Sequence, residues 1–155
     1  MKIIFAEVSD APIIHQLMVQ AFNEYKNKVP PTSALNETVE SITEALIDGE
    51  HALISYMDDE PVGMVRFRVT NEGVYFFRLS ITPEKQGQGI AKQLLKSLEN
   101  HAIQRNHPAL LCKVRMDVPK NIQLYQSIGF TIYDEYAIHK PNGITINVVA
   151  MKKVL

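Results

Sequence analysis

The spacing of hydrophobic positions near the start of the chain predicts a short strand followed by an amphipathic helix. Ile3–Val8 is mostly apolar and has the length of one strand. Over residues 13–22 the apolar side chains recur three and four positions apart, which places them on one face of a helix. Ser9 and Asp10 can cap this helix, and Pro12 suits its first turn.

A second helix is expected to begin at Asn36 and to stop at Gly49. It follows the stretch Asn27–Asn36, which contains Pro30 and Pro31 and which we interpret as a loop between helices rather than a domain boundary. The helix has one apolar face, and glycine commonly ends a helix. The apolar positions of this face are Val39, Ile42 and Leu46.

The hydrophobic period then changes to two, which predicts β-strands. Pro61–Val69 shows the alternation, and Ala52–Met57 and Val74–Thr82 flank it across short turns. Strands joined by tight turns pair antiparallel, so we expect a three-stranded meander. The alternating positions are Met64, Arg66 and Arg68 on one side and Val65, Phe67 and Val69 on the other.

The next part of the chain predicts a long helix between two strands. The helix is expected from about Ile90 to about Arg105, and the strand Ala109–Arg115 follows it. A strand, a helix and another strand in this order imply a right-handed crossover and parallel pairing. The expected buried stripe of the helix is Ala91, Leu94, Leu95, Leu98, Ala102 and Ile103.

The last part predicts a short helix and a hairpin. The helix covers about Lys120–Ile128 and is closed by Gly129. Phe130–His139 and Ile144–Lys152 flank a Pro-Asn-Gly turn and read as paired strands. The whole pattern predicts an α/β (α+β) fold with roughly seven strands in a mixed sheet and about four helices.

Composition and charge fit one domain, expected to span residues 1–155, because 155 residues is an ordinary domain length. Sixteen Lys and Arg against 17 Asp and Glu leave a net charge of −1, which argues against nucleic acid or an anionic membrane as the main partner. A single cysteine, Cys112, suits a reducing compartment. The apolar start is too short for a signal peptide or a membrane span, so we expect a cytoplasmic location.

The segment Ile81–Ala91 carries the clearest indication of chemistry. It leads from a strand into the start of the long helix, where main-chain N–H groups lack partners and the helix dipole adds positive charge. Gly87 and Gly89 let the main chain approach an anion, so a phosphate is a natural ligand. A nucleotide-triphosphate loop would need Gly-Lys-Ser/Thr, and a dinucleotide fingerprint would need a small residue where Lys92 stands. A helix-starting turn that binds nothing is the alternative.

Two motifs resemble those of the GCN5-related N-acetyltransferase (GNAT) family. Gln86–Ala91 matches the family motif Gln/Arg-x-x-Gly-x-Gly/Ala, and Leu79–Pro83 is similar to the strand before it. Asn121–Phe130 is similar to the second family signature, which is Asn, then Leu-Tyr, then Gly-Phe. Gln86 stands where Arg is commoner and Ala91 where Gly is commoner. The missing arginine removes one charge contact and lowers the expected affinity for the cofactor.

The resemblance implies a three-layer α/β/α fold whose seven-stranded, mainly antiparallel sheet splays between its fourth and fifth strands. It also implies that the pantetheine arm of acetyl-CoA lies in that gap and pairs with main-chain groups of the fourth strand. The pyrophosphate would bind the amides of the glycine loop. The cofactor-binding residues implied are Leu79, Ile81, Gln86, Gly87, Gln88, Gly89, Ile90, Ala91, Asn121 and Tyr125.

The resemblance further implies that Tyr125 is the general acid and that Asn121 hydrogen-bonds the pantetheine arm. The two residues are spaced to lie on one face of the short helix. A phenol with a pKa of about 10 can protonate a leaving thiolate with a pKa of about 8.5. The Leu79 amide would stabilise the developing oxyanion. The alternatives are a core role for Tyr125 and a helix-capping role for Asn121.

The function expected from this resemblance is N-acetyl transfer from acetyl-CoA to a primary amine of a small molecule or peptide, by direct attack in a ternary complex. The alternatives are an acyl-CoA sensor without turnover and an unrelated phosphate-binding protein. The acceptor site is expected within Val19–Leu35 and the last hairpin, and Glu24, Tyr133 and His139 are candidate bases. Because family members often pair through their C-terminal strands, a homodimer is also expected.

The remaining reactive side chains have simpler interpretations. Cys112 is expected to be a small buried residue rather than an acetyl-carrying nucleophile. The five histidines show no tight ligand spacing, so no metal is expected. Arg66, Arg68 and Arg78 are interpreted as solvated-face residues, and the alternative is that one of them binds a carboxylate or phosphate of the acceptor.

Overall fold

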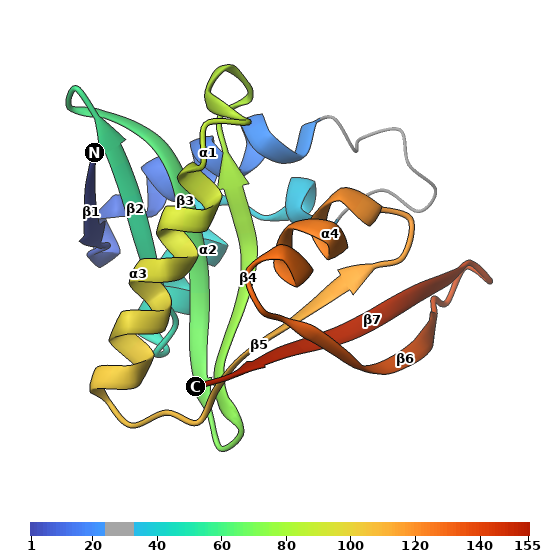
Figure 1. Ribbon diagram of the computed structural model, residues 1–155. Coiled ribbons are helices and arrows are strands. Elements are labelled where there is room, and N and C mark those ends of the chain that lie inside the picture. Colours follow the sequence, from blue (N-terminus) through green and yellow to red (C-terminus); the bar gives the residue numbers. More distant parts are fainter. Residues whose placement is uncertain (24–32) are drawn as a thin grey trace. The chain divides into compact units, whose positions relative to one another are not determined.

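The computed structural model describes residues 1–23 and 33–155, and its elements follow the predicted order (Figure 1). The strands form one open, mixed sheet in the order β1-β2-β3-β4-β5-β7-β6, which confirms the predicted fold class. The strands are β1 Lys2–Phe5, β2 His51–Met57, β3 Glu60–Thr70, β4 Gly73–Ile81, β5 Ala109–Arg115, β6 Thr131–His139 and β7 Thr145–Val154. The α-helices of the described residues are α1 Ala11–Phe22, α2 Val39–Ile47, α3 Ile90–Gln104 and α4 Pro119–Ser127.

The chain groups into two compact units, which are described in turn. Unit 1 comprises Met1–Arg68 and Phe76–Asn100, and unit 2 comprises Val69–Tyr75 and His101–Leu155. Unit 1 therefore holds β1, β2, most of β3 and β4, and the helices α1 and α2. Unit 2 holds β5, β6, β7 and α4. The prediction of one domain over residues 1–155 stays a prediction.

Unit 1 is built on the predicted antiparallel meander. β1 pairs with β2, and β2 pairs with β3 with a register shift between Ser55 and Tyr56. α1 and α2 bury their apolar faces against this part of the sheet, as their spacing predicts. Each fully buried Leu or Ile side chain stabilises such a core by about 1.5–3 kcal/mol relative to exposure. The core is made of Ala11, Ile14, Leu17, Met18, Ala34, Ile42, Ala52, Ile54 and Met64.

Local capping moves two boundaries away from their predicted places. The first strand ends at Phe5 because a 3-10 turn, Val8–Asp10, follows it and is closed by the Glu7 amide donating to Asp10 at 2.8 Å. α2 begins at Val39 rather than Asn36, because the Thr38 side chain accepts from the Ser41 amide at 3.0 Å. Its predicted end is confirmed, since Gly49 follows the helix with φ of +107°.

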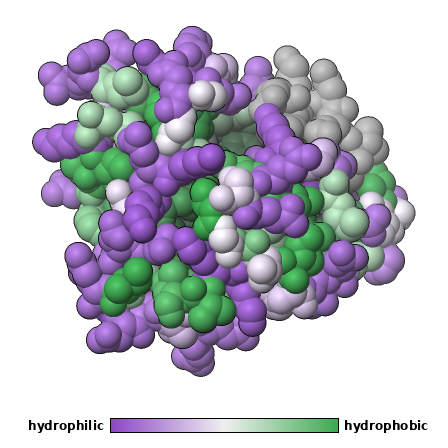
Figure 2. Space-filling view, viewed as in Figure 1, coloured by the Kyte–Doolittle hydropathy of each residue, from purple (hydrophilic) through white to green (hydrophobic). Residues whose placement is uncertain are grey.

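α3 has the predicted length, and its buried stripe is confirmed at Leu94, Leu95, Leu98 and Ala102. Ala91, also predicted to be buried, is only half-buried. Ile103, predicted to be buried, is 49% exposed, since it lies beside the helical row that ends at Ala102 rather than on it. On the face drawn in Figure 2, outside the grey residues, hydrophilic residues cover most of the surface and hydrophobic ones form separate groups. No helix of the described residues is long and apolar enough to cross a membrane. The buried positions of α3 are Ile90, Leu94, Leu95, Leu98 and Ala102.

Unit 2 contains the parallel pairing that the crossover predicts. Val74 and Tyr75 at the start of β4 pair with Leu110 and Leu111 of β5. A side chain on Gly73 would collide with the Ala109 carbonyl, so this approach requires glycine. β7 pairs antiparallel with both β5 and β6. β6 is the edge strand, and of its residues all but Tyr136 are exposed.

Candidate active site

The segment between β4 and α3 has the geometry that its glycine motif predicts. A 3-10 turn, Pro83–Lys85, follows β4, and α3 begins at Ile90. The Gln93 amide donates to the Gly89 carbonyl at 3.1 Å, which makes Gly89 the residue that opens the helix. The amides before Gln93 in this first turn have no intrahelical acceptor and lie at the positive end of the helix dipole. Such an arrangement favours an anionic ligand.

Both glycines of this loop have a left-handed backbone conformation. Gly87 has φ of +81° and Gly89 has φ of +83°, and a Cβ at either position would meet nothing within 4 Å. The glycines are therefore required by backbone conformation and not by crowding, since another residue in this region costs about 1–2 kcal/mol. Successive amides that alternate between right- and left-handed conformations form a concave anion-binding nest.

The Gln86 side chain ties this loop to the strand before it. Its Nε2 group donates to the Ile81 carbonyl at 3.2 Å, across the turn that separates β4 from the loop. This residue stands where the family more commonly has arginine. The hydrogen bond shows that the shorter amide side chain holds the loop in place, although it brings no positive charge.

Within the continuous strand β4, the backbone departs from the regular strand conformation at Arg78. Arg78 has φ of +55°, a conformation that residues other than glycine seldom adopt. The Arg66 guanidinium lies 5.2 Å from the centre of the Phe77 ring, and Arg78 bonds to Glu37, which Arg66 also bonds. Phe77 thus contacts Arg66 while Arg78 bonds the Glu37 that is paired with Arg66, whereas a regular strand would direct two consecutive side chains to opposite faces. We call this feature the Arg78 kink.

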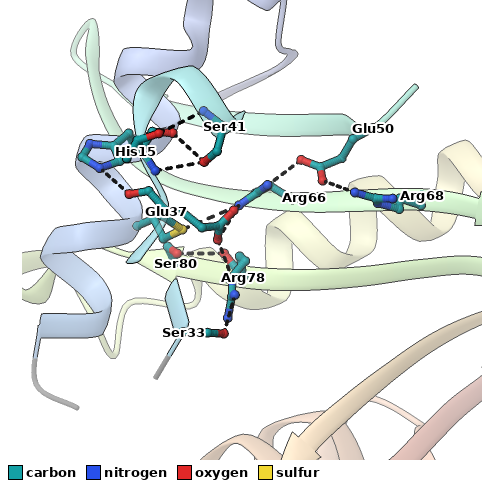
Figure 3. A network of polar contacts seen from close by, with 11 residues as sticks. His15, Ser33, Glu37, Ser41, Glu50, Arg66, Arg68, Arg78 and Ser80 are labelled. Carbon is teal, nitrogen blue, oxygen red and sulfur yellow. Dashed lines mark hydrogen bonds and ion pairs between the residues drawn. The ribbon is translucent and has the colours of Figure 1, made fainter. Parts of the chain in front are cut away.

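A network of buried and half-buried charges surrounds the kink (Figure 3). Arg66 is 2% exposed and its Nε donates to Glu50 at 2.7 Å. Its Nη1 donates to both carboxylate oxygens of Glu37, at 2.8 and 2.9 Å. Burial lowers the pKa of Arg66, but the hydrogen bonds and charges of Glu50 and Glu37 outweigh it and raise that pKa. The prediction that Arg66 lies on a solvated face is therefore wrong.

The other two arginines lie at the edges of this network. The Arg78 Nε donates to Glu37 at 2.9 Å and its Nη2 to the Ser33 hydroxyl at 2.9 Å. Arg68 donates to Glu50 at 3.1 Å, and its side chain is 58% exposed, as predicted for a solvated residue. Sequence reasoning missed Glu37 and Glu50 as partners. The available signal was an arginine on the same strand face as Met64, where the meander buries its apolar side chains.

The second motif lies on α4 in unit 2. Asn121 and Tyr125 both belong to this helix and share a face, as predicted. The cap position is Val118, so a capping role for Asn121 is wrong. Tyr125 is 6% exposed, its ring lies 5.7 Å from that of Phe130, and its carbonyl accepts the Phe130 amide at 3.0 Å. The turn after the helix thus fixes the position of the tyrosine.

The remaining candidate residues contribute less. Glu24 lies outside the described residues, as does most of the predicted acceptor segment Val19–Leu35. Burial, and then the Glu72 carboxylate, raise the pKa of Tyr133, so less of it is present as the phenolate that could accept a proton near neutral pH. His139 is exposed and contacts the Thr145 hydroxyl at 3.1 Å. Burial raises the pKa of Cys112 to about 12, in agreement with a small buried residue. In residues 1–23 and 33–155, no group of three or more His, Cys, Asp or Glu could hold a metal ion.

Comparison with known proteins identifies the family. A family model described as "Acetyltransferase (GNAT) family" matches residues 14–130. No curated protein sequence matches the chain. Two solved structures are similar in fold: a ribosomal-protein-alanine N-acetyltransferase from Brucella melitensis and the ribosomal-protein-S18-alanine N-acetyltransferase from Escherichia coli. The first is 18% identical with a TM-score of 0.82 and covers 100% of both chains. The second is 17% identical with a TM-score of 0.79 and covers 99% of this chain and 92% of its own.

A spermidine N-acetyltransferase mutant from Vibrio cholerae is also similar, with 21% identity, a TM-score of 0.75, and coverage of 99% of this chain and 95% of its own. At such identities these three structures show the fold alone, whereas the family model covers most of the chain. The resemblance of the two sequence motifs to those of the GNAT family predicted this result. The chain belongs to the GNAT acetyltransferase family and is an acetyl-CoA-dependent N-acetyltransferase.

Proposed function

We propose that the chain transfers an acetyl group from acetyl-CoA to a primary amine of a small molecule or peptide, and releases coenzyme A. The observation that carries this proposal is the loop Gln86–Ala91, which has two glycines with positive φ and leads directly into the first turn of α3. Gln86–Gly89 are exposed, so a diphosphate can reach these amides. This supports binding of the cofactor pyrophosphate by Gln86, Gly87, Gln88, Gly89, Ile90 and Ala91.

In this proposal each remaining site residue has one task. Main-chain groups of Leu79 and Ile81 pair with the pantetheine arm, and Asn121 hydrogen-bonds it. The amine nitrogen attacks the thioester carbonyl carbon, the C–S bond breaks, and the Tyr125 hydroxyl gives its proton to the departing thiolate. The Leu79 amide donates to the carbonyl oxygen as negative charge develops there. A base takes the proton that the amine loses.

The loop is tested by placing a negative charge where the diphosphate would bind. In the Gly89→Glu chain we expect acetyl-CoA binding, measured by calorimetry, to be abolished through bulk and charge repulsion. Gly143→Glu is the matched control, since Gly143 is also left-handed, with φ of +84°, and is equally open. Retained acetyl-CoA binding in Gly89→Glu, or a wild-type preference for ATP or NAD, would contradict the proposal.

The acid role is tested with Tyr125→Phe, which removes only the hydroxyl. We expect turnover to fall while affinity for acetyl-CoA stays within a few-fold of wild type. Tyr56→Phe, a change on β2, is the control. Equal turnover in the two variants would remove the acid role. If neither the wild-type chain nor the two variants showed turnover while acetyl-CoA still bound, the alternative of an acyl-CoA sensor would be favoured.

The acceptor is best sought with a panel of amines and detection of the free thiol of coenzyme A. The similar structures are named for acting on ribosomal-protein alanine and on spermidine, so the panel contains alanine-initiated peptides and polyamines. Amino acids and aminoglycosides complete it.

The single cysteine supports a cytoplasmic location, and a homodimer through the C-terminal strands is proposed from the family resemblance.

A further inference from the structure

The Arg78 kink needs an explanation that the proposed function does not yet give. A residue other than glycine in the left-handed region is strained and persists only when its surroundings determine its conformation. Arg78 belongs to β4, one residue before Leu79 and three before Ile81. Leu79 and Ile81 are the residues whose main-chain groups are proposed to pair with the pantetheine arm. Such strain gathers at functional sites, so its position beside these groups points to a role there.

The contacts around Arg78 determine its conformation from both sides. Its carbonyl accepts the Ser80 hydroxyl at 2.7 Å, and Ser80 is 1% exposed. Its guanidinium is held by Glu37 and Ser33, each at 2.9 Å. The main chain is thus fixed on the side of Ser80, and the side chain is fixed on the side of the segment that precedes α2.

Glu37 is the residue on which these contacts converge. Arg66 holds both of its carboxylate oxygens, and Glu50 in turn fixes Arg66. The His15 ring contacts the Glu37 carbonyl at 3.1 Å, which anchors the main chain of this residue to α1. The Glu37 carboxylate therefore has little freedom, and the bond that it accepts from Arg78 holds that side chain at a fixed place (Figure 3).

The kink decides which way the end of β4 faces. Phe77 and Arg78 both reach the Arg66–Glu37 pair, so every residue after Arg78 is turned over relative to an uninterrupted strand. The peptide groups of the following residues turn with the side chains. If Arg78 returned to a regular strand conformation, Leu79 and Ile81 would present different main-chain groups to a ligand.

We propose that Glu37 is a positioning residue of the acetyl-transfer site, which holds the Arg78 kink and so sets the main-chain groups of Leu79 and Ile81 toward the pantetheine arm. This inference rests on the proposed function. It adds a residue outside both family motifs. It also links the segment Ser33–Glu37, which precedes α2, to the geometry of β4.

The test separates the kink from the guanidinium that holds it. Arg78→Gly and Arg78→Ala both remove the clamp, but glycine accepts a positive φ and alanine does not. Two probes are measured by calorimetry: acetyl-CoA, and 3′-phospho-ADP, which has the diphosphate without the pantetheine arm. We expect Arg78→Ala to weaken acetyl-CoA binding about five- to tenfold and Arg78→Gly to weaken it about twofold at most, following the cost of left-handed alanine. Binding of 3′-phospho-ADP should stay within about twofold in both.

Glu37→Gln completes the test, because it keeps the shape of the side chain and removes the charge that Arg78 binds. We expect it to weaken acetyl-CoA binding in the Arg78 chain and to add little in combination with Arg78→Gly, since both changes act on one device. Thermal unfolding checks that each variant folds.

Three results would overturn the inference and leave the proposed function standing. The first two are equal losses in Arg78→Gly and Arg78→Ala, and a Glu37→Gln chain that binds acetyl-CoA as wild type does. The third is equal weakening of both probes, which would show a general disturbance of unit 1. A wild-type chain that binds neither probe would overturn the proposed function and, with it, this inference. The wild-type result therefore tests the function, and the differences among variants test the role of Glu37.

Discussion

The two units treat buried titratable groups in opposite ways. Unit 1 buries charges and pairs them: Arg66 is 2% exposed and Glu50 is 4% exposed, and they bond at 2.7 Å. Unit 2 buries a titratable group and keeps it neutral: Cys112 is 3% exposed, and burial raises its pKa to about 12. Both solutions follow one rule, because an unpaired charge in a low dielectric is far more costly than a paired or neutral group.

This difference predicts how each unit fails. Unit 1 should lose stability when one member of the Arg66–Glu50 pair is removed, because the other member then stays charged and buried without that partner. Unit 2 should lose stability at high pH, because the Cys112 thiol ionises in water once the chain unfolds but stays neutral in the folded state. On the surface of either unit, where water screens charge, the same substitutions should have small effects.

The largest effect is expected for Glu50→Ala, which removes the acceptor of the buried Arg66 Nε and leaves this guanidinium with Glu37 as its carboxylate partner. Removing one partner of a buried ion pair costs about 3–5 kcal/mol, and Glu50 also accepts Arg68. Urea unfolding measures the loss. Glu72→Ala, an exposed acid of unit 2, is the control and should stay within about 0.5 kcal/mol of wild type.

A double variant sharpens this prediction. Glu50→Leu with Arg66→Met removes both charges and leaves apolar side chains, so it should lose less stability than Glu50→Ala alone. A Glu50→Ala chain within about 1 kcal/mol of wild type would show that Glu37 and water suffice to stabilise the Arg66 charge, and that unit 1 does not depend on the Arg66–Glu50 pair.

The sequence predicted the parts of this molecule that depend on local rules. Hydrophobic period, tight turns and the strand-helix-strand order gave the meander, α3 and the parallel pairing of β4 with β5. The boundaries that failed, at Val8–Asp10 and Thr38, depend on capping contacts that compete closely with continued strand or helix.

The candidate site divides in the same way. The glycine loop could be predicted from the sequence because its geometry is fixed by adjacent residues and by the start of a helix. The Glu37–Arg66–Glu50 network is not, because its members are far apart in the chain and meet only after folding. The Arg78 kink could not be predicted from a hydrophobic pattern of period two either, because an arginine at this position does not indicate a positive φ.

The second largest effect is a loss of stability at high pH caused by Cys112. The folded pKa is about 12, raised from 9.0, so its contribution is fully present below pH 9 and is lost as pH rises toward 12. Between pH 8 and pH 10 wild type should lose about 1.4 kcal/mol relative to Cys112→Ala, which cannot ionise there.

Urea midpoints of both chains at the two pH values measure this difference. A thiol reagent at pH 8 gives a second reading, since the native thiol should react far more slowly than the thiol of the urea-unfolded chain. Parallel pH profiles for the two chains would show that the buried thiol does not govern unit 2 at high pH.

A smaller effect is expected for Arg68→Ala, which removes the exposed member of the network in unit 1. The Arg68 side chain is 58% exposed, and Glu50 keeps its shorter bond to Arg66. Solvent screening limits the loss to about 1 kcal/mol at most, including the contact of the guanidinium with the Phe77 ring at 5.8 Å. The loss should shrink in high salt. A loss near that of Glu50→Ala would mean that exposure does not separate the two arginines.

The smallest effect is expected for Lys113→Met in unit 2, where the charge lies on tyrosine rings instead of carboxylates. The Lys113 ammonium is 5.8 Å from the Tyr75 ring centre and 5.7 Å from that of Tyr136, and the residue is exposed. Both distances are near the outer limit of a cation–π contact, so we expect a loss of about 0.5 kcal/mol in urea unfolding. Methionine retains the apolar stem, so the change isolates the charge. A loss above about 2 kcal/mol would show that unit 2, like unit 1, depends on a desolvated cation, and the contrast between the units would then disappear.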